Sequence, residues 1–495
     1  MTAAPPLRLS AVAEALRSAG LLVAVRGGED VLVEGVSQDS RSAEPGDLFL
    51  AWAGTVHDAH DFVADAVDAG AVAAVVERFV PDAGVPQLRV VDGRTAAARA
   101  ADRVLGRPGR SVHLVGVTGT NGKTTTTVLA RHLLQRGLPA AAVGTLGLLE
   151  PSGDVRPGTE GLTTPGPVRI ARWMRSLVDE GVEAVVVEAS SHALEQRRLD
   201  GLRFATAVYT NLSRDHLDYH ESEEAYFAAK ARLLGLVREE GAAVVHAGVE
   251  AWEELPVGRL RTVRYTAGEE PADLRAREVE PRIDGCRFRM ETDHAAAEVT
   301  MPLPGRFNVE NALAAVGAAL AAGITLDEAA AGLAEAPQVP GRLEVVVREP
   351  FTVLIDYAHT PDALERVLAA LRPLVPGRLT VVFGAGGDRD REKRPLMGAA
   401  AAEVADRIFV TSDNPRSEDP DAIIDDIVPG LRGAEHVRIT DRTRAIRAAL
   451  ESAEPGELVL LAGKGHETYQ EIDGERRPFD ERALVRDWRS HREAT

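Results

Sequence analysis

Short apolar runs alternate with amphipathic stretches along most of the chain. The apolar runs have strand length and the amphipathic stretches have helical spacing. This alternation is typical of a mostly parallel, doubly wound sheet, because each parallel strand needs a crossover connection to reach the next. One series of strands is predicted in the middle of the chain, at residues 111–117, 184–188, 205–209 and 242–246. A second series follows, at residues 351–355, 379–383, 407–411 and 458–461.

The N-terminal block and two turn-rich segments complete the expected organisation. A helix at residues 10–19, a helix at residues 62–69 and a strand at residues 71–76 precede the first series. Residues 279–301 alternate apolar and polar positions, which predicts a small antiparallel insertion. Linkers are predicted at Pro108-Gly109 and Pro340-Gly341. We therefore predict an α/β protein with a substrate domain (1–107), a central P-loop-type domain (108–339) and a Rossmann-like domain (340–495), which agrees with roughly 150 residues per domain.

A glycine-rich segment joins the first central strand to a helix. Gly119 and Gly122 let backbone N–H groups approach phosphate oxygens without a Cβ between them. Lys123 adds a full positive charge, and Thr124 offers a hydroxyl suited to Mg²⁺. The usual P-loop has glycine six residues before its lysine, whereas this chain has Val117. The segment therefore predicts a variant phosphate loop, and the strand before it and helix after it argue against a turn that binds nothing.

Composition narrows the classes of partner. The formal net charge of −19 disfavours nucleic acids and anionic membranes, since both need a positive protein surface. A single cysteine, Cys286, excludes an intrachain disulfide and a cysteine zinc cluster, and it fits a reducing compartment. No apolar run approaches the ~20 residues that span a bilayer. We expect a cytoplasmic monomer that acts on small molecules.

Polar residues follow the predicted central strands. Glu188 ends the strand at residues 184–188, and His216 lies beyond the strand at residues 205–209. Ligands in open α/β sheets lie at the carboxyl ends of the strands, so both residues should share an edge with Lys123. Both are candidate metal ligands. The alternatives are a solvated strand-end acid for Glu188 and a structural histidine bonded to backbone for His216.

Three loops of the last domain repeat this arrangement. Residues 384–391, 412–416 and 463–467 each follow a predicted strand and carry arginines or acids. Guanidinium groups pair with carboxylates and carboxylates with ammonium groups, so one pocket lined by these loops suits a zwitterion. Each loop alone could be an ordinary charged surface. A nucleoside triphosphate in the central domain and an amino acid in the last one predict acyl activation followed by amide formation.

Three motifs together resemble a known family. Thr118-Gly-Thr-Asn-Gly-Lys-Thr124, Gly305-Arg-Phe-Asn-Val-Glu-Asn311 and Asp356-Tyr-Ala-His-Thr-Pro361 are similar to motifs of the Mur ligases of peptidoglycan synthesis. The resemblance extends over essentially the whole chain in the family's three-domain order. The variant phosphate loop is the family's own form.

Further motifs resemble one branch of the family, the member that adds the third residue of the stem peptide. Asp39-Ser-Arg and Gly463-Lys-Gly-His-Glu467 carry that resemblance, and Asp413-Asn-Pro-Arg416 resembles the form found when the third residue is meso-diaminopimelate. The resemblance implies that ATP phosphorylates the free carboxylate of D-glutamate in UDP-N-acetylmuramoyl-L-alanyl-D-glutamate. The diaminopimelate amine then attacks the acyl phosphate. Arg416 would bind the second carboxylate, which lysine lacks.

The resemblance also implies roles for individual residues. The catalytic and metal-site residues would be Lys123, Thr124, Glu188, His216 and Lys230, with Mg²⁺ bound and Lys230 carboxylated on its side-chain nitrogen. From the residues alone, Lys230 is predicted to be a solvated lysine of a helix. ATP would contact Thr118, Gly119, Thr120, Asn121, Gly122, Lys123, Thr124, Asn308, Arg342 and Asp356. The uridine nucleotide would contact Ser40, Thr55, Val56, His57, Thr163, Thr164, Ser190, Gln196 and Arg198. Diaminopimelate would contact Arg389, Asp413, Asn414, Pro415, Arg416, Gly463 and Glu467.

One departure and three alternatives remain. The family often has Asp-Gly where this chain has Asp58-Ala59, which puts the local turn in doubt because alanine disfavours positive φ. A lysine-adding ligase should lack arginine at position 416. A folyl-polyglutamate ligase has no reason to carry Asp39-Ser-Arg. A nucleotide-binding switch protein should hydrolyse ATP without regard to any amino acid.

Overall fold

The computed structural model describes residues 5–54, 57–159 and 161–493. The chain forms two compact units. The first unit contains Met1–Arg275, Thr292–Ala295 and Glu310–Ala329, and the second contains Ala276–Glu291, Ala296–Val309 and Ala330–Thr495. The predicted α/β class is confirmed, because parallel sheets covered by helices occur in both units. The domain boundaries themselves stay predictions.

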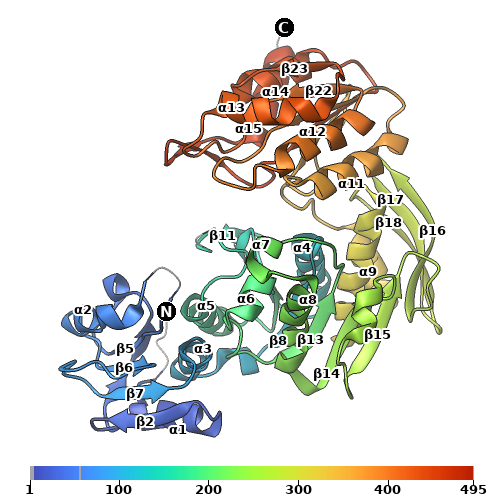
Figure 1. Ribbon diagram of the computed structural model, residues 1–495. Coiled ribbons are helices and arrows are strands. Elements are labelled where there is room, and N and C mark those ends of the chain that lie inside the picture. Colours follow the sequence, from blue (N-terminus) through green and yellow to red (C-terminus); the bar gives the residue numbers. More distant parts are fainter. Residues whose placement is uncertain (1–4, 55–56, 160, 494–495) are drawn as a thin grey trace. The chain divides into compact units, whose positions relative to one another are not determined.

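The N-terminal part of the first unit is a five-stranded sheet of order β2-β7-β6-β5-β4, in which only β2 runs antiparallel to its neighbour (Figure 1). Alternate residues of β5 face opposite sides: Leu48 and Leu50 pack with α1 and α3, while Phe49 packs with α2. The elements are β1 (Leu7–Arg8), α1 (Leu9–Ser18), β2 (Leu22–Arg26), β3 (Leu32–Val33), β4 (Gly35–Ser37), β5 (Asp47–Leu50), α2 (Val63–Asp68), β6 (Ala73–Val76), β7 (Gln87–Val90) and α3 (Gly93–Val104).

The rest of the first unit is built on a second sheet, in which β9, β12, β8, β13, β14 and β15 lie side by side and parallel. Helix α4 packs over β8, β9 and β12, and α5 contributes Ile170, Trp173 and Met174 to the core of this sheet. The strands are β8 (His113–Thr118), β9 (Ala140–Gly144), β10 (Gly147–Leu149), β11 (Val155–Arg156), β12 (Ala184–Glu188), β13 (Phe204–Tyr209), β14 (Val237–His246) and β15 (Arg261–Thr266). The helices are α4 (Lys123–Leu134), α5 (Pro167–Asp179), α6 (Ser191–Glu195), α7 (Leu217–His220) and α8 (Glu223–Ala231).

The predicted linker at Pro108-Gly109 is not an open loop. It forms a 3₁₀ turn, Pro108–Arg110, with Pro108 and Gly109 buried. A Cβ on Gly109 would lie 3.0 Å from Leu202 and 3.2 Å from Leu114, so the turn is packed against the central core. Proline at the first position of the turn explains why a sequence pattern typical of a linker is ordered here.

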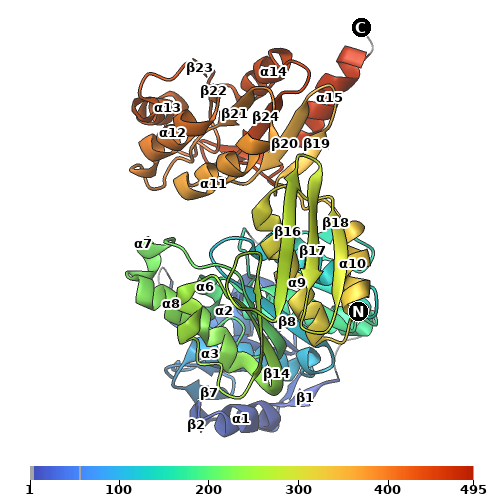
Figure 2. The same cartoon turned by 90° about the vertical axis from the view of Figure 1, so that its right-hand side faces the viewer.

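The predicted antiparallel insertion is confirmed and begins a few residues earlier than expected. Figure 2 shows β16 (Leu274–Arg282), β17 (Gly285–Glu291) and β18 (Ala296–Met301) as neighbouring strands, and β17 pairs with β18 in antiparallel register. Helices α9 (Arg306–Ala321) and α10 (Leu326–Ala334) follow.

The C-terminal sheet of the second unit has the order β19-β20-β24-β21-β22-β23, with β19 antiparallel at one edge and the other strands parallel. Helices α11, α12 and α13 pack on one face, and α14 and α15 on the other. The strands are β19 (Glu344–Val347), β20 (Thr352–Asp356), β21 (Leu379–Phe383), β22 (Arg407–Val410), β23 (His436–Arg438), β24 (Leu458–Ala462), β25 (Tyr469–Ile472) and β26 (Glu475–Pro478). The helices are α11 (Pro361–Leu371), α12 (Lys393–Val404), α13 (Pro420–Ile427), α14 (Arg442–Glu451) and α15 (Glu481–Glu493).

Within the described residues, no helix combines the length and the apolar character that crossing a bilayer requires.

Candidate active site

The phosphate loop lies between β8 and α4, where two glycines have conformations that side chains disfavour. Gly119 has φ 148° and Gly122 has φ 81°. A Cβ on Gly119 would lie 1.9 Å from the Thr210 hydroxyl, and one on Gly122 would lie 2.2 Å from Asn311 Oδ1. Both positions therefore require glycine, for packing as well as for φ.

A residue beyond the neighbouring strand fixes the loop. Thr120 N–H donates to the Asn211 carbonyl at 2.8 Å, and Asn121 N–H donates to Asn211 Oδ1 at 2.8 Å. The Thr210 hydroxyl donates to the Asn121 carbonyl at 2.7 Å. These bonds connect the end of β13 to the loop that follows β8, so two adjacent strands position the same segment.

The side-chain nitrogens of two lysines converge on one carbonyl of this loop. Lys123 Nζ donates to the Gly119 carbonyl at 3.0 Å, and Lys230 Nζ donates to the same oxygen at 2.7 Å. The expectation from the residues alone, that Lys230 is solvated, is wrong: the residue is 1% exposed and stands over the face of Tyr226. Helix α8 turns this lysine inward. Burial, and secondly the charge of Lys123, hold the pKa of Lys230 well below its usual value.

Glu188 is not the solvated strand-end acid that was the alternative for it. It is 1% exposed at the end of β12. Its carboxylate accepts bonds from the Thr124 hydroxyl (3.2 Å), from Thr145 N–H (3.0 Å) and from the Thr145 hydroxyl (3.0 Å). A Cβ on Gly144 would lie 2.2 Å from Glu188 Oε1, so β9 leaves room for the carboxylate only because residue 144 is glycine. The structure therefore places Glu188 against the first turn of α4.

His216 caps the short helix α7 and has a left-handed backbone conformation, with φ 53°. Its side chain is half-exposed, with Nε2 3.4 Å from Asp215 Oδ2, and its ring meets the ring of His192 edge to face at 4.8 Å. His192 follows β12 and His216 follows β13, so residues after the two strands on either side of β8 meet here. The edge-to-face contact with His192 and the Asp215 contact orient the His216 ring, and its role as a metal ligand stays a prediction.

Five of the residues expected to bind the uridine nucleotide, those between residues 163 and 198, form a connected network at the end of β12. The Thr164 hydroxyl donates to the Glu188 carbonyl at 2.6 Å and lies 3.1 Å from the Ser190 hydroxyl. Arg198 donates to the Thr164 carbonyl at 2.7 Å and to Gln196 Oε1 at 2.5 Å. The Thr163 hydroxyl accepts from Thr145 at 3.3 Å. Burial lowers the pKa of Arg198.

The N-terminal candidates lie in two short turns. Ser40 begins a 3₁₀ turn capped by Asp39, whose side chain accepts from Arg41 N–H at 3.0 Å. His57 is exposed, while Thr55 and Val56 lie outside the described residues. The doubt raised by Ala59 is removed, because Asp58 caps a 3₁₀ turn that contains Ala59 at an ordinary φ.

The residues expected near the ATP nucleoside belong to the second unit. Asp356 is buried, and its two oxygens accept from the backbone N–H groups of Leu343 and Ala358, each at 2.8 Å. Burial raises the pKa of Asp356. The Arg342 guanidinium stands 4.7 Å from the Tyr357 ring centroid, and buried Asn308 donates to the Pro304 carbonyl at 2.7 Å. Asp356 therefore fixes the backbone beside Arg342.

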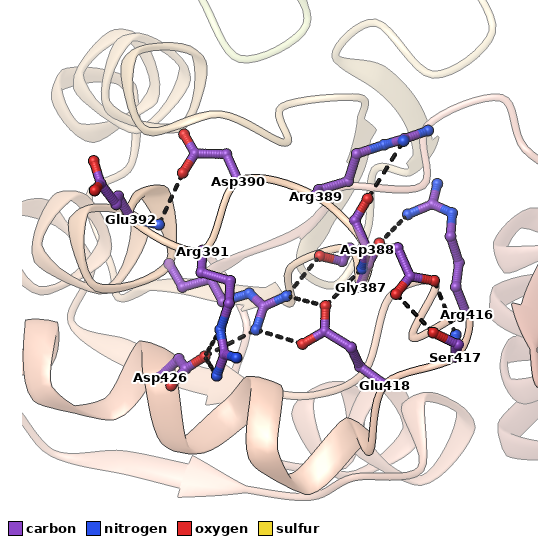
Figure 3. Close-up of polar contacts among 12 residues, drawn as sticks. Gly387, Asp388, Arg389, Asp390, Arg391, Glu392, Arg416, Ser417, Glu418 and Asp426 are labelled. Carbon is purple, nitrogen blue, oxygen red and sulfur yellow. Dashed lines mark hydrogen bonds and ion pairs between the residues drawn. The ribbon is translucent and has the colours of Figure 1, made fainter. Parts of the chain in front are cut away.

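The structure brings the three strand-end loops of the second unit together. Gly387 N–H donates to the Asn414 carbonyl at 2.9 Å. Arg416 donates to the Gly387 carbonyl at 2.6 Å (Figure 3). The third loop contributes Lys464, whose ammonium donates to Asn414 Oδ1 at 2.8 Å and to Glu467 at 2.7 Å. A Cβ on Gly463 would lie 2.9 Å from Asp413 Oδ2, Pro415 is buried between its neighbours, and the Arg389 side chain is exposed.

Lys393 and Lys464 are residues at this site that sequence reasoning missed. Lys464 is fully buried, and Lys393 donates to the His359 carbonyl at 3.1 Å with its pKa lowered by burial. A signal was available: Lys123, Lys230, Lys393 and Lys464 are the only lysines among 57 lysines and arginines. Two of these lysines lie at the phosphate loop of the first unit and two among the amino-acid loops of the second unit.

The oxygen donors beside the phosphate loop suit a hard cation only if Lys230 is carboxylated. The Thr124 hydroxyl and the Glu188 carboxylate supply oxygen, which Mg²⁺ prefers. Within the described part of the chain, no three His, Cys, Asp or Glu side chains cluster as a metal site. Lys230 as an ammonium would repel a cation, whereas a carboxylated Lys230 would add a third oxygen donor.

Comparison with known proteins identifies the family. Residues 32–104 match the "Mur ligase family, catalytic domain", residues 117–319 the "Mur ligase middle domain" and residues 341–465 the "Mur ligase, glutamate ligase domain". Relatives named "UDP-N-acetylmuramoyl-L-alanyl-D-glutamate--2,6-diaminopimelate ligase" are 44% identical in Gloeobacter violaceus (94% of this chain, 95% of that protein) and 42% identical in a Nostoc species (92% and 94%). A solved structure of the same name aligns with a TM-score of 0.71 at 33% identity, covering 99% of this chain and 100% of that one. The chain belongs to the Mur ligase family.

Proposed function

We propose that this chain is an ATP-dependent ligase that adds meso-2,6-diaminopimelate to UDP-N-acetylmuramoyl-L-alanyl-D-glutamate in peptidoglycan precursor synthesis. The products are ADP, phosphate and the UDP-linked tripeptide. The similarity of 44% over 94% of the chain to a ligase with this name carries the proposal. The position of Arg416 beside the loop that holds Lys464 and Glu467 supports the choice of amino acid.

The first unit activates the acid. The loop from Thr118 to Thr124 binds the phosphates of ATP through backbone N–H groups, and Lys123 offsets charge that spreads over the transferring phosphoryl group. Lys123 now donates to two carbonyls of its own loop, so it must turn from these acceptors toward phosphate. When bound, Mg²⁺ would supply further charge neutralisation, and Thr124, Glu188, His216 and carboxylated Lys230 are the residues that would hold it. The γ-phosphoryl group passes to the D-glutamate carboxylate and leaves ADP.

Carboxylation of Lys230 follows from the charge of its surroundings. Only the neutral amine attacks CO₂, and the lowered pKa of Lys230 favours that form. The new N–C bond costs the amine one proton, which passes to solvent. A neutral buried amine beside Lys123 becomes an anion, so the charge of Lys123, which disfavours an ammonium at position 230, stabilises the carbamate.

The second unit binds the amino acid. Arg416 pairs with the carboxylate at the far end of diaminopimelate, and Arg389 lies on the adjoining loop. Asp413 and Glu467 carry the negative charge that suits an ammonium group, and Lys464 holds Glu467 in place. The free amine attacks the acyl phosphate, an amide bond forms and phosphate departs. L-Lysine has no far carboxylate, so it would leave the Arg416 guanidinium without its partner.

The remaining expectations are a monomeric enzyme in the cytoplasm, where its nucleotide substrates are at hand and one buried thiol, Cys286, stays reduced. A lysine-adding ligase is the alternative within the family. A nucleotide-binding switch would release phosphate without any amino acid.

One assay tests the proposal. Phosphate release is measured with purified protein, ATP, Mg²⁺ and the UDP-linked dipeptide, with and without meso-diaminopimelate. We expect phosphate release by the protein to require ATP, Mg²⁺, the UDP-linked dipeptide and meso-diaminopimelate together. Release that ignores the amino acid would support a switch protein, and release that depends on L-lysine alone would support the lysine-adding alternative.

A further inference from the structure

A fully buried arginine in the second unit holds two of the amino-acid loops. Arg394 lies in the first turn of α12, and its side chain is 0% exposed. Its guanidinium donates to both oxygens of Glu418, at 2.8 and 3.0 Å, and to Asp426 Oδ2 at 2.8 Å. It also donates to the Gly386 carbonyl at 3.3 Å. One side chain therefore connects residues 386, 418 and 426.

These contacts involve residues next to Arg389 and Arg416, which are proposed to bind diaminopimelate. Glu418 also accepts from Asp388 N–H at 2.6 Å, next to Arg389. Asp388 in turn accepts from Ser417 N–H at 3.1 Å and from the Ser417 hydroxyl at 2.7 Å, next to Arg416 (Figure 3). The loop that carries Arg389 and the loop that carries Arg416 are thus joined to each other and, through Glu418, to Arg394.

The backbone of Arg416 needs such support. Arg416 has φ 53°, a left-handed conformation that non-glycine residues adopt at a free-energy cost and keep only where neighbouring contacts impose it. Its N–H donates to the Glu471 carbonyl at 3.0 Å on the other side of the loop. Its guanidinium donates to the Gly387 carbonyl at 2.6 Å and lies 3.4 Å from the Glu471 carboxylate, so its direction depends on the loop that carries Gly387 and Asp388.

The charges make the Arg394 contacts persistent. Arg394 lowers the pKa of Glu418 to about 2 and, together with Arg391, also lowers that of Asp426. Both carboxylates are ionised near neutral pH, so the bonds to Arg394 are charge-assisted. A lysine at position 394 would keep the charge but could not present the planar fork that meets both oxygens of Glu418 and reaches Asp426.

We infer that Arg394 is a positioning residue that sets the affinity and selectivity for diaminopimelate by fixing the Arg389 and Arg416 loops against each other. The inference rests on the proposed function, because it assigns those loops to diaminopimelate. Arg394 touches no substrate itself. Its loss should therefore weaken diaminopimelate binding and leave the binding of ATP and of the UDP-linked dipeptide unchanged.

The test compares the three KM values in the phosphate-release assay for wild type, Arg394→Lys and Arg394→Gln. For Arg394→Lys we expect the KM for diaminopimelate to rise at least 10-fold, with both other KM values within 2-fold of wild type, and for Arg394→Gln a larger rise. The preference for diaminopimelate over L-lysine should fall in parallel. The matched control is Arg438→Gln, which removes an exposed arginine of the same unit that pairs with Asp421 and Asp425. It should leave all three KM values unchanged.

The outcomes separate this inference from the proposed function. A wild-type protein without diaminopimelate-dependent release refutes the function. An active wild type whose Arg394→Lys variant shows no change, or equal rises in all three KM values, overturns the inference. Should the Arg394 variants fail to fold, Ser417→Ala decides, because it removes only the exposed hydroxyl bond to Asp388. It should raise the KM for diaminopimelate at least 3-fold, and an unchanged KM overturns the inference.

Discussion

Replacing Lys230 by methionine tests whether this buried lysine serves the reaction or the fold. Methionine has a similar length and no charge. Lys230 is 1% exposed, and its side-chain nitrogen contacts the Gly119 carbonyl at 2.7 Å and the Tyr226 ring at 4.3 Å. Loss of one hydrogen bond from a neutral amine costs ~0.5–1.5 kcal/mol, while burial of an incompletely bonded donor costs ~1–3 kcal/mol in the wild type. These two effects oppose each other, so Lys230→Met should not lower the free energy of unfolding by more than about 1 kcal/mol.

The effect on the reaction should be far larger. A charged group that stabilises only the transition state contributes ~2.7–4 kcal/mol, which corresponds to a loss of about 10²–10³ in kcat. The assay is phosphate release at saturating substrates, with thermal unfolding measured on the same preparations. A Lys230→Arg variant is the second control, because arginine keeps a cation but cannot be carboxylated in the same way. It should be as inactive as Lys230→Met.

Two results would refute this reasoning. A Lys230→Met enzyme with kcat within 3-fold of wild type would show that the side chain has no part in the reaction. A variant that loses activity and unfolds at much lower temperature would show a structural role. Mass spectrometry of the intact wild-type protein, kept in bicarbonate buffer, should in addition show the mass of one CO₂ that Lys230→Met lacks.

Two further predictions concern a glycine and a buried acid. Gly144→Ala places a Cβ 2.2 Å from Glu188 Oε1, so Glu188 must move; we expect at least a 10-fold loss of kcat or a 10-fold higher Mg²⁺ requirement, whereas Gly235→Ala, where a Cβ meets nothing within 4 Å, should be neutral. A normal Mg²⁺ titration for Gly144→Ala would argue against Glu188 as a metal ligand. Burial raises the pKa of Asp102 from 3.8 to about 6, so above pH 6 the folded state holds an ionised buried acid at a cost of roughly 3 kcal/mol. Asp102→Asn should therefore raise Tm at pH 8, and the gain should shrink as pH falls from 6 toward 4; a gain independent of pH would contradict this assignment.

The strand series was predictable because apolar runs of strand length carry their own signal. The strand expected at residues 184–188 coincides with β12, and the one expected at residues 379–383 coincides with β21. The order of the strands was not predictable, because the hydrophobic pattern of a strand buried on both faces does not specify its neighbours. The burial of the predicted linker at Pro108-Gly109 was not predictable for a related reason: proline and glycine mark a turn whether or not tertiary packing buries it.

At the site, the sequence indicated which residue types gather but not how they are buried. Gly119 and Gly122 were identified from the motif alone, and the structure adds the contacts that forbid a side chain there. The burial of Lys230 could not be predicted from the sequence. Helix α8 contains both apolar and charged residues, and tertiary contacts decide which side of the helix faces inward. Arg394 went unnoticed for the same reason, since an arginine beside Lys393 and Glu392 is usually solvated.

The most direct test of the assigned function is a competition in one tube. Purified protein receives ATP, Mg²⁺, the UDP-linked dipeptide and equal concentrations of meso-diaminopimelate and L-lysine, and mass spectrometry measures the ratio of the two tripeptide products. We predict that the diaminopimelate product exceeds the lysine product at least 100-fold, and that Arg416→Ala reduces this ratio at least 10-fold. Equal amounts of the two products from the wild-type enzyme would contradict the account.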